Sequence, residues 1–261
     1  MALPSIVIML ITGFYNIADT FFVGKLSTQA TAAVGVVFSV MFFVQAIGFF
    51  FGHGSGNYIS RELGAQLHGN AQRMASTGFF LSFTLGLVVL LIGEACITPL
   101  SLWLGSTPTI LPHTKQYLGI SLLGTPFFTS SLTMNNQMRF QGNARLALWG
   151  ILSGAIVNVL LDPLFIFVFD MGVAGAALAT VIGQIVSFLI LLRMTYLGGN
   201  IRYSWRNFTP KVALFKEIIA GGTPSLSRQG LACIAMILLN TAASAYGDVA
   251  IAAMSIVSRC T

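Results

Sequence analysis

Residues 151–169 read ILSGAIVNVLLDPLFIFVF, an apolar run long enough to cross a bilayer as a helix. Asn158, Asp162 and Pro163 interrupt it. A carboxylate at that depth costs several kcal/mol, from roughly 3 to more than 10 depending on the method, and is kept where a polar cavity or a partner compensates. Asn158 lies one turn before Asp162 on the same face, and Pro163 frees a backbone carbonyl one turn back. This pattern predicts a site for a small cation or a proton. The alternative is a neutral carboxyl group that bonds to Asn158 and serves packing alone.

The composition indicates a membrane protein. Of the 261 residues, 56% are hydrophobic and only 8% are charged, whereas soluble domains have about 25% charged residues. The net charge is +6, but the basic residues lie between apolar runs, a pattern that orients a membrane protein and gives no support for nucleic-acid binding. The three cysteines are isolated and form neither a metal-binding spacing nor a disulfide framework. The predicted fold class is an all-α polytopic membrane protein.

Hydropathy predicts seven spans, each long enough to cross ~30 Å of hydrocarbon at about 1.5 Å per residue. They cover residues 3–23, 32–59, 74–98, 116–138, 146–169, 173–196 and 218–246. An eighth apolar run opens at Val249 and reaches the last residue before it is long enough to span. Pro126 and Pro224 are expected to kink the fourth and seventh spans. The sequence thus predicts a chain that stops early in a second group of helices.

Small residues recur four positions apart in several spans, and such faces let helices approach closely in lipid. The residues concerned are Gly48, Gly52 and Gly56, then Gly150 and Gly154, and finally Gly175, Ala179 and Gly183. We interpret all three sets as packing faces.

The loops alternate in charge. Nine basic residues follow the second, fourth and sixth spans: Arg61, Arg73, Arg139, Arg145, Arg193, Arg202, Arg206, Lys211 and Lys216. Only Lys25 and Lys115 follow the first and third. By the positive-inside rule the N-terminus is cytoplasmic. The long basic connection 198–217 is then a cytoplasmic linker between a six-helix transmembrane unit, residues 1–197, and the start of a second unit, residues 218–261.

Other polar residues lie within the predicted spans. Asp19 and Tyr15 share one face of the first span, so Asp19 is either a second carboxylate for the site of Asp162 or a residue at the end of its helix. Thr180 in the sixth span is by itself expected to bond back to its own backbone.

Four more polar residues are candidates for lining a cavity. Asn135 and Asn136 end the fourth span and reach either a cavity or the cytoplasmic interface. His53 can titrate near neutral pH, but a structural histidine is the simpler interpretation. Arg228 either extends toward the membrane surface or pairs with a carboxylate in the cavity.

Motifs typical of enzymes and pumps are missing from the sequence. Residues 53–56 read HGSG, which differs from the Gly-x-Ser-Gly of rhomboid-type proteases, and the sequence contains neither His-Glu-x-x-His nor a nucleotide-binding loop. We therefore expect neither an enzyme nor an ATP-driven pump, and no cofactor beyond a coupling ion.

Several motifs together resemble those of MATE (multidrug and toxic compound extrusion) transporters. Residues 15–24 (YNIADTFFVG) are similar to the first-helix motif of that family, and residues 138–145 (MRFQGNAR) to its loop after helix four. Residues 158–163 (NVLLDP) resemble the helix-five motif and residues 172–177 (GVAGAA) the start of helix six. Residues 224–229 (PSLSRQ) look like the MepA-type bacterial branch.

The resemblance implies a fold of twelve helices in two lobes, of which this chain would hold the N-lobe, helix seven and part of helix eight. It implies a cation site, for Na⁺ or H⁺, at Asp19, Asn158, Asp162 and Thr180, with Tyr15 beside it. It also implies an antiporter in the bacterial cytoplasmic membrane that exports organic, often cationic, drugs and toxins and needs its second lobe for activity. The alternatives are a flippase for lipid-linked precursors, which should show a cationic cavity, and an inactive fragment.

Overall fold

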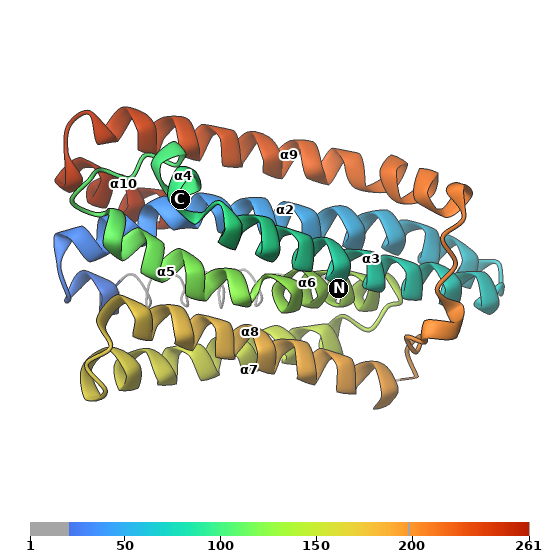
Figure 1. Ribbon diagram of the computed structural model, residues 1–261. Coiled ribbons are helices and arrows are strands. Elements are labelled where there is room, and N and C mark those ends of the chain that lie inside the picture. The colour runs from blue at the N-terminus through green and yellow to red at the C-terminus, as the bar shows by residue number, and fades with distance from the viewer. Residues whose placement is uncertain (1–20, 198, 261) are drawn as a thin grey trace.

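The computed structural model describes residues 21–197 and 199–260, and every regular element in these residues is a helix (Figure 1). Tyr15, Asp19 and most of the first predicted span lie outside the described residues. The α-helices are α2 (Thr28–Gly64), α3 (His68–Ala95), α4 (Ile97–Trp103), α5 (Leu111–Leu123), α6 (Thr125–Phe140), α7 (Ala144–Pro163), α8 (Gly172–Leu197), α9 (Val212–Ser244) and α10 (Asp248–Cys260). A π-helical turn, η1 (Leu164–Val168), continues α7, and a 3₁₀ turn, η2 (Trp205–Asn207), lies before α9.

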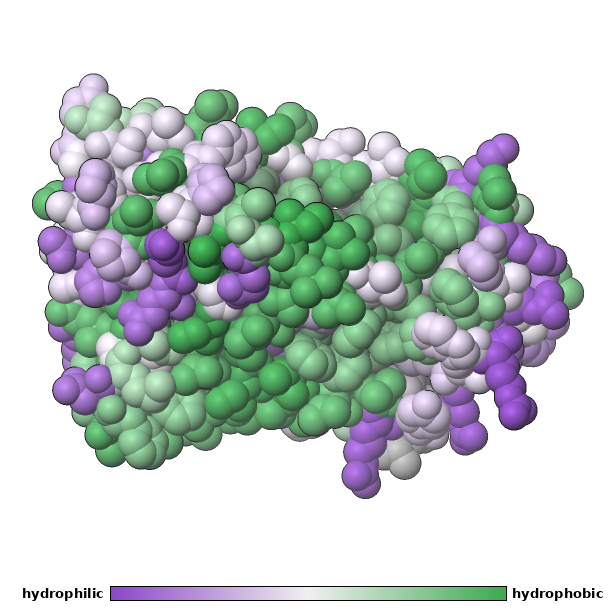
Figure 2. All heavy atoms as spheres, in the orientation of Figure 1, coloured by the Kyte–Doolittle hydropathy of each residue, from purple (hydrophilic) through white to green (hydrophobic). Residues whose placement is uncertain are grey.

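The long helices run along one axis. In Figure 1, α9 forms one edge of the bundle, α7 and α8 form the other, and α2, α3, α5 and α6 lie between them. Among the described residues, five helical segments are long and apolar enough to cross a membrane: Thr28–Gly64, His68–Ala95, Ala144–Val168, Gly172–Tyr196 and Val212–Ser244. Hydrophilic groups gather at the two ends of the bundle with an apolar belt between them (Figure 2). These features confirm the predicted all-α polytopic membrane fold.

The fourth predicted span is two helices, because the chain breaks between α5 and α6 at Gly124. The side chain of Gln184 from α8 occupies the space that a Cβ at Gly124 would need. Pro126 lies in the first turn of α6. Backbone N–H groups in a first turn have no acceptor within the helix, so a proline there costs no hydrogen bond. Pro224, by contrast, lies inside the unbroken helix α9. The fourth span is therefore interrupted two residues before Pro126, with Gly124 still in a helical conformation.

Close contacts through small residues hold the helices together, as the spacing predicts. The first glycine set lies on the face of α2 that contacts α6, where ideal Cβ atoms would collide with side chains one turn apart. The contacting pairs are Gly48 with Leu132, Gly52 with Asn136, and Gly56 with Phe140.

The face of α2 toward α9 carries a series of polar contacts along its length. Gln229 Nε2 donates to Gln45 Oε1 at 3.0 Å. Near the end of α2, Arg61 pairs with Glu217 at 2.6 Å. Helix α9 begins at Val212, ahead of the predicted start at residue 218, so the ion pair lies within helices on both sides. Helix α9 is thus attached along the length of α2.

The connection between α8 and α9 packs against α3. The Tyr203 ring stacks on Phe79 with 4.7 Å between centroids, and its hydroxyl donates to Gln137 Oε1 at 2.8 Å. Burial raises the pKa of Tyr203, which keeps this hydroxyl protonated. The predicted linker is therefore anchored by buried contacts.

Candidate ion and substrate site

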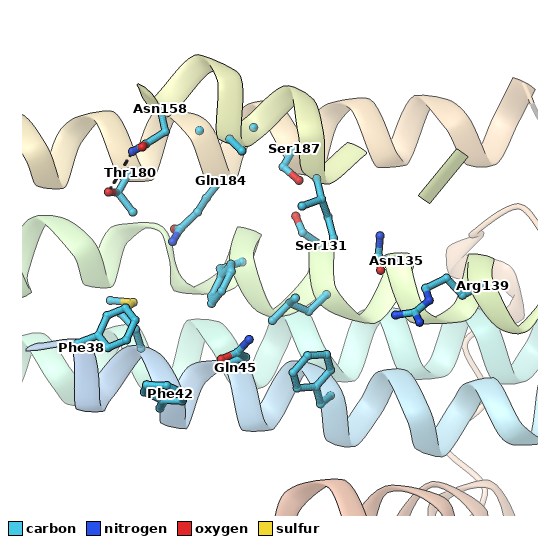
Figure 3. Close-up of a pocket in the computed structure, with 18 of the residues that line it drawn as sticks. Phe38, Phe42, Gln45, Ser131, Asn135, Arg139, Asn158, Thr180, Gln184 and Ser187 are labelled. Carbon is cyan, nitrogen blue, oxygen red and sulfur yellow. Dashed lines mark hydrogen bonds between the residues drawn. The ribbon is translucent and has the colours of Figure 1, made fainter. Parts of the chain in front are cut away.

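Helices α7 and α8 bring two of the predicted site residues together. Asn158 Nδ2 donates to Thr180 Oγ1 at 3.2 Å (Figure 3). Asn158 is 1% exposed and Thr180 is 8% exposed. Thr180 was expected, taken alone, to bond to its own backbone; instead its hydroxyl accepts from a neighbouring helix. The contact joins residues that are 22 positions apart in the sequence.

Glycines set the distance between these helices. A Cβ at Gly154 would lie 2.6 Å from the Gly183 carbonyl oxygen, and a Cβ at Gly183 would lie 3.1 Å from the Asn158 Cβ. Because neither position carries a side chain, the backbones of α7 and α8 approach closely enough for Asn158 to reach Thr180. The predicted packing faces thus determine the geometry of the polar pair.

Asp162 lies one turn beyond Asn158 and is fully buried, at 0% exposed. Pro163 follows it, and the helix continues as the π-helical turn η1, where the regular hydrogen-bond ladder is interrupted. The carboxylate of Asp162, the Oδ1 of Asn158 and the hydroxyl of Thr180 are all oxygen groups suited to a hard cation, and the carboxylate can also hold a proton. Asn158 Oδ1 is buried and has no hydrogen-bond donor among the described residues.

A cavity of about 250 Å³ adjoins this pair and is lined by helices α2, α5, α6, α7 and α8. Asn158 and Thr180 lie at one end, and Arg139 lies at the other (Figure 3). The aromatic lining includes Phe38, Phe42, Phe49 and Phe128. The polar lining includes Gln45, Ser131, Asn135, Gln184 and Ser187. Such a mixture of aromatic walls and a few amides and hydroxyls is typical of sites for small organic molecules.

The four other predicted lining residues occupy different places. Asn135 lines the cavity, and its Nδ2 donates to the Ala147 carbonyl at 2.8 Å. Asn136 donates within its own helix and lies against Gly52 of α2. His53 and Arg228 are outside the cavity lining.

His53 nevertheless contacts both a lining residue and α9. Its ring stacks on Phe49 with 5.4 Å between centroids, and its Nδ1 lies 2.9 Å from the Ser225 hydroxyl. Arg228 is exposed on α9 beside Gln229.

Sequence reasoning missed Gln45 and Gln184. Each is an uncharged amide inside an apolar helix, which the sequence shows. Both were missed because the search for site residues concentrated on charged side chains. Gln184 Oε1 is buried without a hydrogen-bond partner in the part of the chain that the structure describes. Arg139 was counted as a loop cation, whereas its side chain lines the end of the cavity that is opposite Asn158 and Thr180.

Residues 4–164, more than half of the chain, match the family model MatE. The chain belongs to the MATE family. The resemblance found in the motifs is thereby confirmed, and the chain is a multi-pass membrane protein of a transporter family rather than an enzyme.

Curated relatives and solved structures agree with this membership. Multidrug export protein MepA of Staphylococcus haemolyticus (strain JCSC1435) is 28% identical over 260 residues, which are 99% of this chain and 58% of the relative. MepA of Staphylococcus aureus (strain MRSA252) is 28% identical over 264 residues, with the same coverage. A solved complex of the MATE multidrug transporter DinF-BH has a TM-score of 0.92 at 28% identity and covers 99% of this chain and 59% of that chain.

A MATE transporter of the MOP superfamily in its inward-facing conformation has a TM-score of 0.89 at 28% identity, covering 95% of this chain and 57% of that one. This MATE chain therefore spans about 58% of the length of the curated relatives it matches.

Proposed function

We propose that this chain serves the export of organic compounds across the bacterial cytoplasmic membrane, coupled to inward movement of Na⁺ or H⁺. The observation that carries the proposal is the buried Asn158–Thr180 pair, with Asp162 one turn away, at one end of an aromatic-lined cavity. The matched relatives are named multidrug export proteins, which supports the same function.

The coupling ion is proposed to bind at Asp162, Asn158 and Thr180. A buried carboxylate is costly when charged, so binding of Na⁺ or of a proton stabilises it. Asn158 Oδ1 offers a further buried oxygen, and Thr180 holds the amide in place. Asp19 and Tyr15, which lie outside the described residues, are proposed to complete the set.

The drug is proposed to occupy the adjoining cavity. The volume of the cavity, about 250 Å³, is close to the lower end of the usual range for ligand pockets, roughly 300–1,000 Å³. Phe38, Phe42, Phe49 and Phe128 offer faces for stacking against aromatic rings. Because Asn158 and Thr180 line this cavity too, the ion and the drug bind next to each other, and each must alter the affinity of the other to the same degree.

We further propose the predicted division and orientation. Residues 1–197 form one lobe, 198–217 a cytoplasmic linker and 218–261 the start of a second lobe. Alternating access needs two lobes that move against each other, so this chain alone is expected to bind drug without exporting it. Ethidium efflux above an empty-vector control, from cells that produce only these 261 residues, would contradict this. The flippase alternative gains no support from the relatives, which are export proteins by name.

The test is ion-dependent drug binding to the purified chain in lipid nanodiscs. Fluorescence anisotropy would give the Kd of rhodamine 6G during a Na⁺ titration at constant ionic strength and, separately, across neutral pH. We expect one of these ions to shift the Kd by about fivefold or more. Asp162→Asn keeps the shape of the side chain but removes its charge, so it should abolish the shift.

Asp170→Asn is the matched control. Asp170 is exposed in the turn between α7 and α8, at a φ of 52° that asparagine tolerates well. It undergoes the same chemical change outside the cavity, and the ion dependence should stay at the wild-type level. An ion-dependent shift that survives in Asp162→Asn would leave Asp162 as a structural carboxyl group and overturn the proposal.

A further inference from the structure

The connection between α8 and α9 carries an aromatic patch, made of Trp205, Phe208 and Phe80. In Figure 1 this connection crosses one end of the bundle, from the end of α8 to the start of α9. The Trp205 ring stacks on Phe208 with 5.6 Å between centroids and meets Phe80 of α3 edge to face at 4.5 Å. Trp205 is nevertheless 71% exposed. The patch therefore offers a fixed apolar surface to something outside the described residues.

Hydrogen bonds to α3 hold this patch in place. The backbone N–H of Ser204 donates to Ser76 Oγ, and that of Thr209 donates to Thr77 Oγ1, both at 3.2 Å. These two contacts lie on either side of η2, the turn that carries the tryptophan. The position of the patch on α3 is thus set from both sides of the turn.

Three exposed arginines flank the aromatic patch: Arg73, Arg202 and Arg206. The carbonyl of Arg73 accepts from Thr77 Oγ1 at 2.7 Å, so Arg73 lies one turn before the residues of α3 that hold the connection. Arg206 directly follows Trp205 in η2. The Arg202 guanidinium lies 5.9 Å from the centroid of the Tyr196 ring, at the end of α8. Two helices and the turn therefore bring positive charge to the patch.

Carboxylates do not balance this charge. Residues 198–216 contain four basic residues and no acidic one. Glu217, the next residue, pairs with Arg61 at 2.6 Å, and Glu62 accepts from Asn70 Nδ2 at 2.9 Å. Among the described residues, no carboxylate forms an ion pair with any of the three arginines. Arginine suits phosphate groups especially, because its planar fork can donate two parallel hydrogen bonds.

The surroundings favour a lipid headgroup over a free anion. The predicted third span begins at residue 74, so the patch lies where α3 enters the membrane. Tryptophan rings are typical of this level of a bilayer, where one side is apolar and the other is wet. Figure 2 shows hydrophilic groups at this end of the bundle, next to the apolar belt. A free phosphate would use the charges alone, whereas a phospholipid would contact both the arginines and the exposed tryptophan.

We propose that the aromatic patch and its three flanking arginines bind an anionic phospholipid. The arginines bind the headgroup phosphate, and Trp205 lies against the first part of the acyl chains. A bound lipid of this kind holds the connection between α8 and α9 against α3. The inference goes beyond the proposed function and depends neither on the coupling ion nor on the drug.

Quenching of tryptophan fluorescence by brominated lipids tests this inference. In the full chain, Trp103→Phe and Trp149→Phe leave Trp205 as the single tryptophan, and both replaced rings are exposed. Nanodiscs of phosphatidylcholine and phosphatidylglycerol would carry bromine on the acyl chains of one lipid or of the other, at the same overall composition. The ratio of the two quenching values reports which lipid lies beside Trp205. It should favour phosphatidylglycerol by about tenfold.

Substitutions in the same background separate the site from overall charge. Arg73→Gln, Arg202→Gln and Arg206→Gln should each lower the preference by about three- to fivefold. Arg206→Lys keeps the charge and should keep most of the preference. Lys25→Gln is the matched control, because Lys25 is an exposed cation 4.4 Å from the centroid of the Phe21 ring. It lies just before α2, which begins at the opposite end of the bundle (Figure 1), so the preference should not change.

Equal quenching by the two lipids would overturn this inference, as would a preference that survives all three Arg→Gln changes. An equal loss in Lys25→Gln and Arg206→Gln would assign the preference to overall charge and overturn the site. Loss of the preference on adding soluble glycerol phosphate would identify a free phosphate, rather than a lipid, as the ligand. Absence of quenching by either lipid would show that protein covers Trp205. Each of these results leaves the proposed function intact, because none of them measures ion-dependent drug binding.

Discussion

Gly154→Ala tests whether the contact between α7 and α8 controls the ion site. The added Cβ would lie 2.6 Å from the Gly183 carbonyl oxygen and 2.8 Å from the Ser187 Cβ. Ordinary contact begins at 3.4 Å, and the obstacle is backbone that cannot rotate away, so the helices must separate. The same separation would lengthen the Asn158–Thr180 hydrogen bond from 3.2 Å to about 4 Å, beyond hydrogen-bonding range.

The expected cost of this change is about 1–3 kcal/mol of stability, the usual range for overpacking. No oxygen ligand is altered, yet the ion dependence of rhodamine 6G binding should fall sharply. Both quantities can be measured on one preparation in nanodiscs, by thermal unfolding and by fluorescence anisotropy. The matched control is Gly230→Ala in α9, where a Cβ meets nothing within 4 Å. That change should be neutral or stabilise the chain by up to ~1 kcal/mol through helix propensity.

A Gly154→Ala chain with the melting temperature and the ion dependence of wild type would refute the reasoning. So would a Gly230→Ala chain that loses as much stability as Gly154→Ala, because the effect would then belong to any glycine in a long helix. Stability loss with intact ion dependence would show that the helices separate without disturbing the site.

Three further outcomes are expected. In a transporter completed with a second MATE lobe, Asp162→Asn and Asp19→Asn should each abolish gradient-driven export from proteoliposomes, and the double variant should be little worse than either; full export by Asp162→Asn would contradict the assignment. The linker is predicted to be cytoplasmic, so Arg206→Cys in a Cys-free background should react with an impermeant maleimide only after the inner membrane face is opened. Labelling in intact cells would contradict this predicted topology. Tyr203→Phe should cost about 1–3 kcal/mol in thermal unfolding, because it leaves the buried Gln137 Oε1 without its 2.8 Å donor; an unchanged melting temperature would show that this oxygen has another partner.

The sequence was sufficient for the second, third, fifth, sixth and seventh spans, because hydropathy and helical periodicity are properties of neighbouring residues. The sequence was also sufficient to place Asn158 and Asp162 on one face of a helix, because residues four positions apart lie one turn apart. The sequence did not predict the break at Gly124. A glycine is needed there because the side chain of Gln184, from another helix, occupies the space that a Cβ would take. Pro126 did indicate an irregularity in this span, which the structure places at Gly124, between α5 and α6.

The family resemblance had already grouped Thr180 with Asn158 and Asp162, but the contacts of the site came from the tertiary structure. Thr180 by itself indicated no more than a bond to its own backbone, and Arg139 indicated only a cytoplasmic loop. Which helices touch in a membrane is decided by close packing of small residues rather than by hydropathy, since lipid is as apolar as the helices themselves. The sequence therefore determined that this chain crosses a membrane and carries a buried carboxylate. Only the packing of α7 on α8, and of α6 on α2, decided that the Asn158 amide pairs with Thr180 at one end of a cavity and that Arg139 lies at the other.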